Sequence, residues 1–334
     1  MFTIGFYQRH FDYRGTGDAI FNYAYYNEKL LNNKSIILFK EPPIAPNVND
    51  SNVRKYYEKY LQIVTYNSPS DLLQKCIDLK IDAIHYLCAG TNDNIIMYDI
   101  PKHIPLFIQN VFIQQPAVFK EQINRNNYYR YGISELTAAP DNNNQFIYHI
   151  VEVDNHNDNL RKELNIPDHA IVFGRHGGVD SFNINYVVQV MKKVLEERND
   201  VYFLFAPQPA LLYHFKHDRV IYLEPFFDKY YKRKFINTCD AYFHARLEGE
   251  SFGIAVMEFN ICNKPVICSP IGENQHVTNL KDKAIYYKNP YELYNIFINY
   301  NKEEMNKRTW YNGNNFTPES VMKQFQKYII DKIN

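Results

Sequence analysis

Short apolar runs alternate along this chain with segments whose apolar residues recur at helical spacing. This β-then-α order is typical of parallel sheets, because a parallel connection needs a crossover long enough to hold a helix. In the first half we expect strands at Phe2–Phe6, Ser35–Phe39, Leu61–Tyr66, Ala83–Leu87 and Ile104–Ile108. In the second half we expect strands at Ala170–Phe173, Val201–Phe205, Arg219–Leu223, Ala241–His244 and Pro265–Ser269. The pattern predicts an α/β protein built on parallel sheets.

The domain organisation follows from length and from one polar segment. A chain of 334 residues is long enough for about two domains, and the turn-prone run Asp154–Asn159 separates the two alternating halves. We therefore predict an N-terminal domain over 1–155 and a C-terminal domain over 156–316. The apolar residues of 317–334 have helical spacing, and we expect this last helix to cross back to the N-terminal domain. Two such domains normally leave a central cleft, faced by the carboxyl ends of both sheets.

Composition excludes several classes of protein. The formal net charge is +0, so no long-range field draws the chain to nucleic acid, and a charged ligand must meet a local patch. The five cysteines form no CxxC pair, which argues against a disulfide framework and a four-thiolate zinc site. No basic-then-apolar signal peptide opens the sequence and no apolar stretch approaches the length of a membrane span. We expect a cytoplasmic protein without a transmembrane segment.

The stretch from Ala241 to Ile267 carries the strongest chemical signal. An expected strand ends near His244, a loop carries Glu250, and a helix then runs to Glu258 and beyond. We expect Ser251 to cap this helix, whose free amides and dipole favour an anion. Glu258 lies among apolar residues, where an ionised carboxylate is costly unless something hydrogen-bonds it. Ligand hydroxyls or a neighbouring donor in the protein both fit that requirement.

The order strand, Glu250, Ser251-Phe252-Gly253, apolar helix, Glu258 and then Asn-Lys-Pro-Val-Ile resembles the EX7E motif of retaining glycosyltransferases. More specifically, it is similar to family-4 enzymes of the GT-B fold, in which the two glutamates and the intervening glycine lie at the sugar-nucleotide site. The resemblance implies two Rossmann-like domains facing a cleft, with the nucleotide sugar on the C-terminal domain and the acceptor on the N-terminal one. It runs from about Ala170 to His276 and is loose before that.

A second element of the resemblance is Gly174-Arg175-His176-Gly177-Gly178, which follows an expected strand. Such a turn brings amides and a guanidinium to a diphosphate, and we expect the Arg175 side chain to leave the turn rather than join the core. The family often adds a lysine about six residues later, where this chain has Ser181. Arg246 or His176 would then be the second phosphate cation. Leu223-Glu224-Pro225 matches the place where the family's backbone meets the nucleotide base.

In the first domain, Gly15-Thr16-Gly17 precedes a helix that we expect Asp18 to cap. The loop would offer amides to the same diphosphate, or it is an ordinary loop, since it is neither a dinucleotide fingerprint nor a Walker A motif. The family often carries a histidine on the first domain near the donor sugar. We assign this catalytic place to His85, with His10, His103 and a structural histidine as alternatives.

Together these features predict a hexosyl transfer from a nucleoside-diphosphate sugar to a glycan or glycoconjugate acceptor, with retention if the analogy holds. Glu250 would bind the donor sugar and Glu258 the ribose. No Asp-x-Asp occurs in the chain, which argues against a metal-held diphosphate, so we expect no metal and no cofactor beyond the donor itself. The alternatives are a nucleotide-sugar epimerase or a catalytically silent sugar-nucleotide binder.

Overall fold

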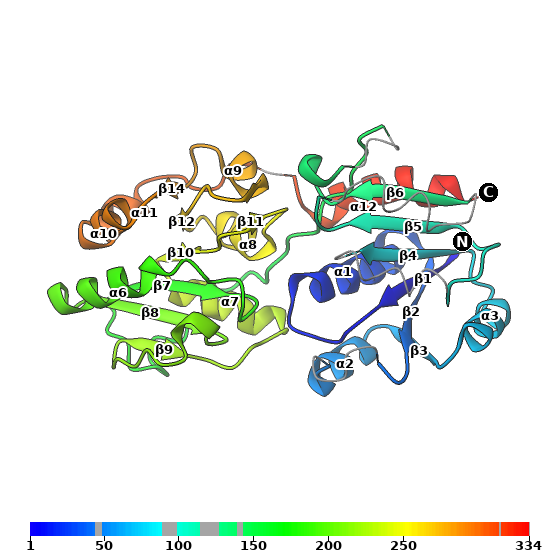
Figure 1. The fold of residues 1–334 in the computed structure, drawn as a ribbon, viewed down its shortest axis with the longest axis horizontal. Coiled ribbons are helices and arrows are strands. Elements are labelled where there is room, and N and C mark those ends of the chain that lie inside the picture. Colours follow the sequence, from blue (N-terminus) through cyan, green and yellow to red (C-terminus); the bar gives the residue numbers. More distant parts are fainter. Residues whose placement is uncertain (44–48, 89–98, 114–126, 139–142, 314, 334) are drawn as a thin grey trace. The chain divides into compact units, whose positions relative to one another are not determined.

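The structure is a computed structural model that describes residues 1–43, 49–88, 99–113, 127–138, 143–313 and 315–333. The chain forms two compact units (Figure 1). Unit 1 comprises residues 1–150 together with 315–334, and unit 2 comprises residues 151–314. The chain thus leaves unit 1 once and returns to it for its last twenty residues, whereas the sequence placed the first boundary at residue 155.

Unit 1 is built on a six-stranded parallel sheet in the order β3-β2-β1-β4-β5-β6. Its strands are β1 (Thr3–Gln8), β2 (Lys34–Lys40), β3 (Gln62–Tyr66), β4 (Ala83–Cys88), β5 (Leu106–Asn110) and β6 (Tyr128–Gly132). Its helices are α1 (Gly15–Leu31), α2 (Ser51–Glu58), α3 (Pro69–Asp78) and α12 (Pro318–Tyr328), with 3-10 turns at Glu135–Thr137 and Ile330–Lys332. The chain reverses its direction of winding between β1 and β4, which is where open α/β sheets bind ligands.

Unit 2 repeats this topology, with a parallel sheet in the order β14-β12-β10-β7-β8-β9. Its strands are β7 (Ile171–His176), β8 (Val201–Ala206), β9 (Val220–Tyr222), β10 (Ala241–Phe243), β12 (Val266–Cys268) and β14 (Ile285–Tyr286), besides a small parallel pair of β11 (Gly249–Glu250) and β13 (Glu273–Asn274). Its helices are α6 (Tyr186–Glu197), α7 (Lys229–Thr238), α8 (Ile254–Ile261), α9 (Gln275–Leu280), α10 (Pro290–Ile298) and α11 (Lys302–Asn306), with a 3-10 turn at Ala210–Leu212. Here the reversal falls between β7 and β10.

The last helix belongs to the core of unit 1. In α12, Val321, Met322 and Phe325 are buried, and the ring of Phe325 lies 5.7 Å from Tyr23 of α1 and 6.0 Å from Phe6 of β1. Figure 1 shows α12, in red, beside the strands of this unit. The amphipathic spacing of the segment therefore serves to cover one face of the first sheet.

One local expectation needs correction, and one strand of unit 1 was not expected from the sequence. Asp18 does not cap α1, because the helix begins at Gly15 with Arg14 as its N-cap, which leaves Asp18 buried in the first turn. The strand β6 was not predicted, because Tyr128-Tyr129-Arg130-Tyr131 is not an apolar run. It is paired along its length with β5 at the edge of the sheet.

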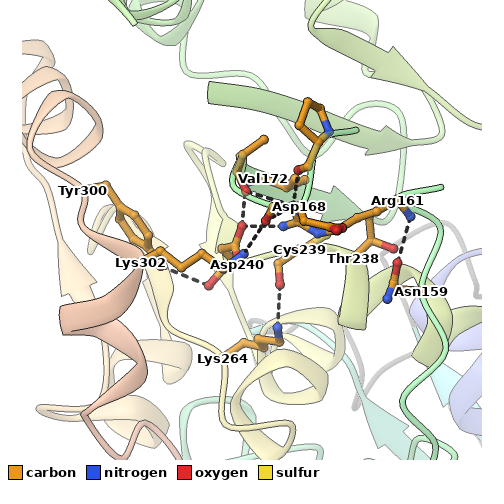
Figure 2. A network of polar contacts seen from close by, with 12 residues as sticks. Asn159, Arg161, Asp168, Val172, Thr238, Cys239, Asp240, Lys264, Tyr300 and Lys302 are labelled. Atoms are coloured by element: carbon orange, nitrogen blue, oxygen red, sulfur yellow. Dashed lines mark hydrogen bonds and ion pairs between the residues drawn. The ribbon is translucent and has the colours of Figure 1, made fainter. Parts of the chain in front are cut away.

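A polar network fixes the amino ends of the central strands of unit 2 (Figure 2). Asp240, just before β10, accepts hydrogen bonds from the Val172 amide of β7 at 2.8 Å and from Arg161 Nη2 at 2.7 Å, and Lys302 Nζ lies 3.0 Å from its other oxygen. Arg161 Nη1 in turn donates to the carbonyl of Ala170 at 2.9 Å. Because its donors and acceptors are matched, we interpret this network as structural. It holds β7 against β10, whose opposite ends carry the residues discussed next.

No helix in the described residues is long and apolar enough to cross a membrane.

Candidate functional site

Arg175 stands at the carboxyl end of β7, next to the reversal point of the unit 2 sheet. Its Nη2 donates to the Gly178 carbonyl at 2.6 Å and to Ser181 Oγ at 2.7 Å, while its Nη1 is buried and has no hydrogen-bond partner in the part of the chain that the structure describes. Burial lowers the pKa of the guanidinium, and the nearby Tyr242 and Glu250 oppose that shift. A buried cation with one unused donor atom is suited to receive an anionic oxygen.

This placement corrects the expectation that the Arg175 side chain leaves a turn. Only 2% of Arg175 is exposed, and its guanidinium packs 5.6 Å from the Phe182 ring. The Ser181 position, where the resembled family often has a lysine, holds the hydroxyl that orients Arg175. Ser181 therefore holds Arg175 in place, and it does not take over the role of the lysine that the resembled family often has at this position.

Glu250 lies on β11, a two-residue strand that reaches its partner β13 through Gly249. Gly249 has φ +69°, and a Cβ there would lie 2.1 Å from the backbone oxygen of Glu273. The Glu250 carboxylate accepts a hydrogen bond from Arg246 Nη1 at 3.0 Å and lies 3.3 Å from His244 Nε2. Burial by itself raises the pKa of Glu250, but His244 and Arg246 outweigh it and hold the pKa at about 2. Glu250 is thus ionised, and Arg246 is its partner.

Gly253, three residues later, shapes the start of α8. It is the N-cap with φ +83°, and a Cβ on it would lie 3.3 Å from both Cβ and Cγ of Glu250. Ser251, which we expected to cap the helix, lies two residues before the N-cap and is buried, as is Phe252. Because its N-cap residue is a glycine, α8 has no capping side chain at that position, and its first turn lies beside Glu250, where the helix dipole favours an anion.

Glu258 is on α8 with 1% of its side chain exposed. Its Oε1 accepts a hydrogen bond from Lys232 Nζ at 2.6 Å, and its Oε2 lies 3.0 Å from His176 Nε2. Burial by itself raises the pKa of this carboxyl, but Lys232 and His176 more than reverse the effect and hold it at about 2. The neighbouring donor that the sequence left open is therefore present in the protein.

Lys232 was missed because it belongs to the basic run Lys229–Lys234, which reads as a solvated helix face. Yet Lys232, Phe235 and Ile236 are all buried in α7. Their i, i+3, i+4 spacing places the lysine on the apolar side of the helix. The spacing of Lys232 relative to Phe235 and Ile236 was therefore the sequence signal that this lysine is buried.

His176 also packs among aromatic rings. Its ring centroid lies 5.6 Å from Phe226, 5.8 Å from Phe235 and 6.1 Å from Phe259. Pro225, the expected base-contacting residue, directly precedes Phe226 and is half-buried in the segment between β9 and α7. The structure thus brings the Pro225 segment next to the His176 and Glu258 end of the site.

A pair of buried histidines near Glu250 was also not predicted from the sequence. His244 and His276 are 2% and 0% exposed, with ring centroids 4.9 Å apart, and the Nδ1 atoms of both are buried without a hydrogen-bond partner among the described residues. Burial, together with the nearby His244, lowers the pKa of His276 to about 4. The predicted end of a strand at His244 gave no sign that the ring turns toward Glu250.

In unit 1, Gly15, Thr16 and Gly17 form the first turn of α1 rather than a loop before it. The Gly17 amide already donates to the Arg14 carbonyl at 3.0 Å, and its own carbonyl accepts from Tyr57 at 2.5 Å. A Cβ at Gly17 would lie 3.0 Å from the Asp12 carbonyl oxygen. The amides of Gly15 and Thr16 stand at the open end of this helix, where the dipole favours an anion.

The structure does not support the catalytic place given to His85. This residue of β4 is 1% exposed, its Nε2 lies 3.0 Å from Gln109 Oε1, and its ring packs 5.4 Å from Tyr23 and 5.5 Å from Phe325. Burial lowers its pKa to about 4. His85 is a core histidine of unit 1, enclosed by α1 and the returning α12, which is the structural alternative left open above.

Among the residues that the structure describes, no three or more His, Cys, Asp or Glu side chains gather as a metal site. The candidate functional site of unit 2 is instead made of two ionised carboxylates, the buried cations Arg175 and Lys232, and the uncapped start of α8.

Comparisons with solved structures concern the whole chain. Anabaena HepE in complex with UDP-glucose superposes with a TM-score of 0.68 at 14% identity, covering 100% of this chain and 97% of that chain. Sucrose-phosphate synthase from Thermosynechococcus elongatus gives 0.66 at 13% identity, covering 99% of each chain. The chain has the GT-B fold.

Other neighbours widen the range of activities found on this fold. A UDP-N-acetylglucosamine 2-epimerase has a TM-score of 0.60 at 12% identity, covering 99% of this chain and 96% of that chain. No family model matches the sequence, and no curated protein matches it. The GT-B fold is thus shared with transferases and epimerases, and the choice between these activities rests on the site.

Proposed function

We propose that this chain is a glycosyltransferase that moves a hexosyl group from a nucleoside-diphosphate sugar to a glycan or other acceptor. One observation carries the proposal: Glu250 lies just before the start of α8 and Glu258 lies in its second turn, both ionised, with the Nη1 donor of Arg175 within electrostatic reach of Glu250. This arrangement offers acceptors for hydroxyls and donors for a diphosphate in one place. The topological reversal between β7 and β10 supports the same location.

The main chemical requirement of such a transfer is to stabilise the charges that develop in the transition state. The sugar becomes oxocarbenium-like while a diphosphate leaves, so preorganised donors aimed at the leaving group dominate the rate. We assign this task to Arg175 and the α8 amides in unit 2. Hydrogen bonds to Gly178 and Ser181 hold the Arg175 guanidinium in place, so it needs little reorganisation when the diphosphate leaves.

The two carboxylates would divide the rest of the donor between them. Glu250 would accept hydroxyls of the transferred sugar, with Arg246 and His244 holding its orientation. Glu258 would accept ribose hydroxyls, since each carboxylate oxygen keeps lone-pair capacity beyond its contact with Lys232 or His176. Pro225 and Phe226 lie on the side of the site where the base would then rest. We further propose retention of configuration, on the resemblance of the Glu250 to Glu258 segment.

Metal independence is part of the proposal. It is supported by the supply of buried cations and amides for the diphosphate and by the absence of Asp-x-Asp from the sequence. Turnover should continue in excess EDTA. Activity that disappears with EDTA and returns only with Mg²⁺ or Mn²⁺ would contradict the assigned phosphate contacts.

The rival function is a nucleotide-sugar epimerase, which the fold of the UDP-N-acetylglucosamine 2-epimerase neighbour favours. Two measurements separate the candidates. A thermal-shift panel of UDP-, GDP- and ADP-sugars identifies the donor, because a ligand that binds the native state stabilises it by mass action. Release of free nucleoside diphosphate is then followed with and without a panel of glycan acceptors. Acceptor-dependent release supports the transferase, whereas interconversion of the sugar without acceptor supports the epimerase. Donor binding with neither reaction would indicate a silent sugar-nucleotide binder.

A further inference from the structure

An aromatic surface lies on unit 1, away from the elements discussed so far. The C-terminal half of α1 carries Tyr25, Tyr26 and Leu30, α2 carries Tyr56, and Tyr60 follows α2 by two residues; we call these five residues the tyrosine surface. Tyr60 is 48% exposed and Leu30 39% exposed, and the other three are half-buried. Leu30 follows Tyr26 by four residues and so shares its side of α1.

The rings of this surface form one cluster. Tyr25 lies 5.1 Å from Tyr26 and 5.9 Å from Tyr60, and Tyr60 lies 5.3 Å from Tyr56. The buried Phe21 packs beneath them, 5.8 Å from Tyr60 and 5.2 Å from Tyr56. The cluster therefore rests on the core of unit 1 and is not a set of separate exposed side chains.

Four lysines accompany the tyrosine surface along the same helices and the strand that follows α1. These are Lys29, Lys34, Lys55 and Lys59, and all four are exposed. In the part of the chain that the structure describes, none of them has an ion-pair partner, whereas the acids nearby are engaged. Glu58 accepts from Arg54 at 3.1 Å, and Glu28 accepts from the Ser35 amide at 2.9 Å. Glu28 keeps its charge, but the four lysines and Arg54 outnumber Glu28, Asp50 and Glu58 along these segments, so a local positive excess accompanies the aromatic cluster in a chain with no net charge.

Tyrosine and lysine at one surface match the chemistry of an anionic bilayer. Tyrosine rings favour the membrane–water interface, and each lysine near an anionic leaflet adds an electrostatic attraction. Stable peripheral attachment generally takes two such signals together. A ring that stacks on a sugar needs an open face. The ring plane of Tyr25 makes angles of 87° with that of Tyr26 and 89° with that of Tyr60, so the faces and edges of these rings contact one another. The observations favour a lipid surface over a stacked glycan.

We propose that the tyrosine surface and its four lysines bind this protein peripherally to the surface of an anionic membrane. This inference is independent of the proposed reaction, because it involves neither the candidate functional site nor a nucleotide sugar. The tyrosine and leucine side chains would enter the interfacial region, and the lysine ammonium groups would meet lipid phosphates. The bound state would place unit 1 at the membrane.

The test is cosedimentation of the whole protein with phosphatidylcholine vesicles, with and without about 30 mol% phosphatidylglycerol, at low salt. We expect binding only to the anionic vesicles, and its loss at about 1 M salt, where the screening length falls to about 3 Å. Replacing Lys29, Lys34, Lys55 and Lys59 with Gln should weaken binding by roughly a hundredfold or more, since each lysine contributes about fivefold. A matched variant carries Gln at Lys102, Lys192, Lys216 and Lys323, which are exposed elsewhere, and should bind like the wild type.

A second variant, Leu30→Ser with Tyr60→Ser, should also weaken binding to anionic vesicles; because Tyr60 packs against Phe21 and Tyr56, its thermal unfolding temperature should fall, and binding is compared at a temperature where both proteins are folded. Three results would overturn the proposal. The protein binds neither kind of vesicle, the matched variant loses as much binding as the first, or a soluble acidic polysaccharide is retained while vesicles are not. The last result would assign the surface to a glycan partner.

Discussion

Lys232 on α7 and Glu258 on α8 form an ion pair inside unit 2, with 2.6 Å between Nζ and Oε1 and with 7% and 1% of their side chains exposed. Ions buried this deeply need good geometry and further hydrogen bonds to offset their desolvation. His176 Nε2 lies 3.0 Å from the second oxygen of Glu258 and also holds the pKa of that carboxyl down. The pair therefore fixes a charged carboxylate at a place where the fold would otherwise favour a neutral group.

Removing one member of this pair should be costly. We expect Lys232→Met to lower the free energy of unfolding of unit 2 by about 3 to 5 kcal/mol, because Glu258 is left buried without its ammonium partner. Urea unfolding at neutral pH measures the change. Trp310, the single tryptophan of the chain, is buried in unit 2, so its fluorescence reports on this unit.

The double variant Lys232→Met with Glu258→Gln should lose less than the sum of the two single variants, since the second change removes the unpaired charge. Lys193→Met, which breaks an exposed pair on α6, serves as the control and should leave the unfolding curve almost unchanged. Additive losses in the double variant would mean that the two side chains contribute separately, against the coupling described here.

Arg175 should matter for turnover more than for architecture. We expect Arg175→Ala to lower turnover by about a hundredfold or more, the usual effect of removing one preorganised charge stabiliser. Because Arg175 is buried, some stability is lost as well, so the informative comparison is with Ser181→Ala. That variant removes one acceptor of Nη2 but keeps the guanidinium and its unused Nη1. It should retain most of the activity. Equal losses in steady-state kinetics for the two variants would instead assign Arg175 to holding the segment around Gly178.

His85 gives a prediction about pH. Its pKa in the folded protein is about 4, below the usual 6.5, so the unfolded chain takes up the proton first. The stability that the neutral ring contributes is present above pH 6.5 and is lost as the pH falls from 6.5 toward 4, by about 3 kcal/mol in all. His85→Gln should flatten the pH dependence of unit 1 unfolding in this range, measured by hydrogen exchange of β4. Transfer activity near neutral pH should survive, and a large loss of activity without loss of stability would restore a catalytic role.

The arrangement of strands was accessible from the sequence because it follows local periodicity. Apolar runs such as Val201–Phe205 are buried on both faces of a parallel sheet, so they stand out by composition alone. The strand β6 does not stand out, since its Tyr and Arg residues are buried only after pairing with β5. The position of Asp18 inside α1 was missed because the Gly15–Gly17 stretch resembles a loop in isolation.

In the candidate site, too, some features could be predicted from the sequence and others could not. The spacing of Glu250 and Glu258 is a property of the sequence, and the structure places Glu250 on β11 just before α8 and Glu258 in the second turn of that helix. Their partners come from other elements: Lys232 from α7, His176 from β7 and His244 from the end of β10. Such contacts depend on how helices and strands pack, and no periodicity in one segment reports them. His85 illustrates the converse, because the helix that encloses it returns from the far end of the chain.

The two glutamates should be separable by ligand. If Glu258 accepts hydrogen bonds from the ribose, Glu258→Gln should weaken both the free nucleoside diphosphate and the intact donor. If Glu250 contacts the transferred sugar, Glu250→Gln should leave the affinity for free diphosphate almost unchanged and weaken only the donor. The expected loss is about 1.5 to 3 kcal/mol for a charged hydrogen bond, or roughly ten- to a hundredfold in affinity.

Isothermal titration of each variant with the diphosphate and with its sugar measures this contrast. Lys232→Met is the discriminating control, because it disturbs Glu258 without touching Glu250 and should therefore follow the Glu258→Gln pattern. A variant that is misfolded would lose both ligands and would show altered Trp310 fluorescence before any denaturant is added, whereas Lys232→Met should keep the native signal and differ only in its unfolding midpoint. If Glu250→Gln weakens diphosphate and donor equally, or Glu258→Gln weakens neither, then the two carboxylates have been assigned to the wrong ends of the donor, and Lys232 would belong to the sugar rather than the ribose.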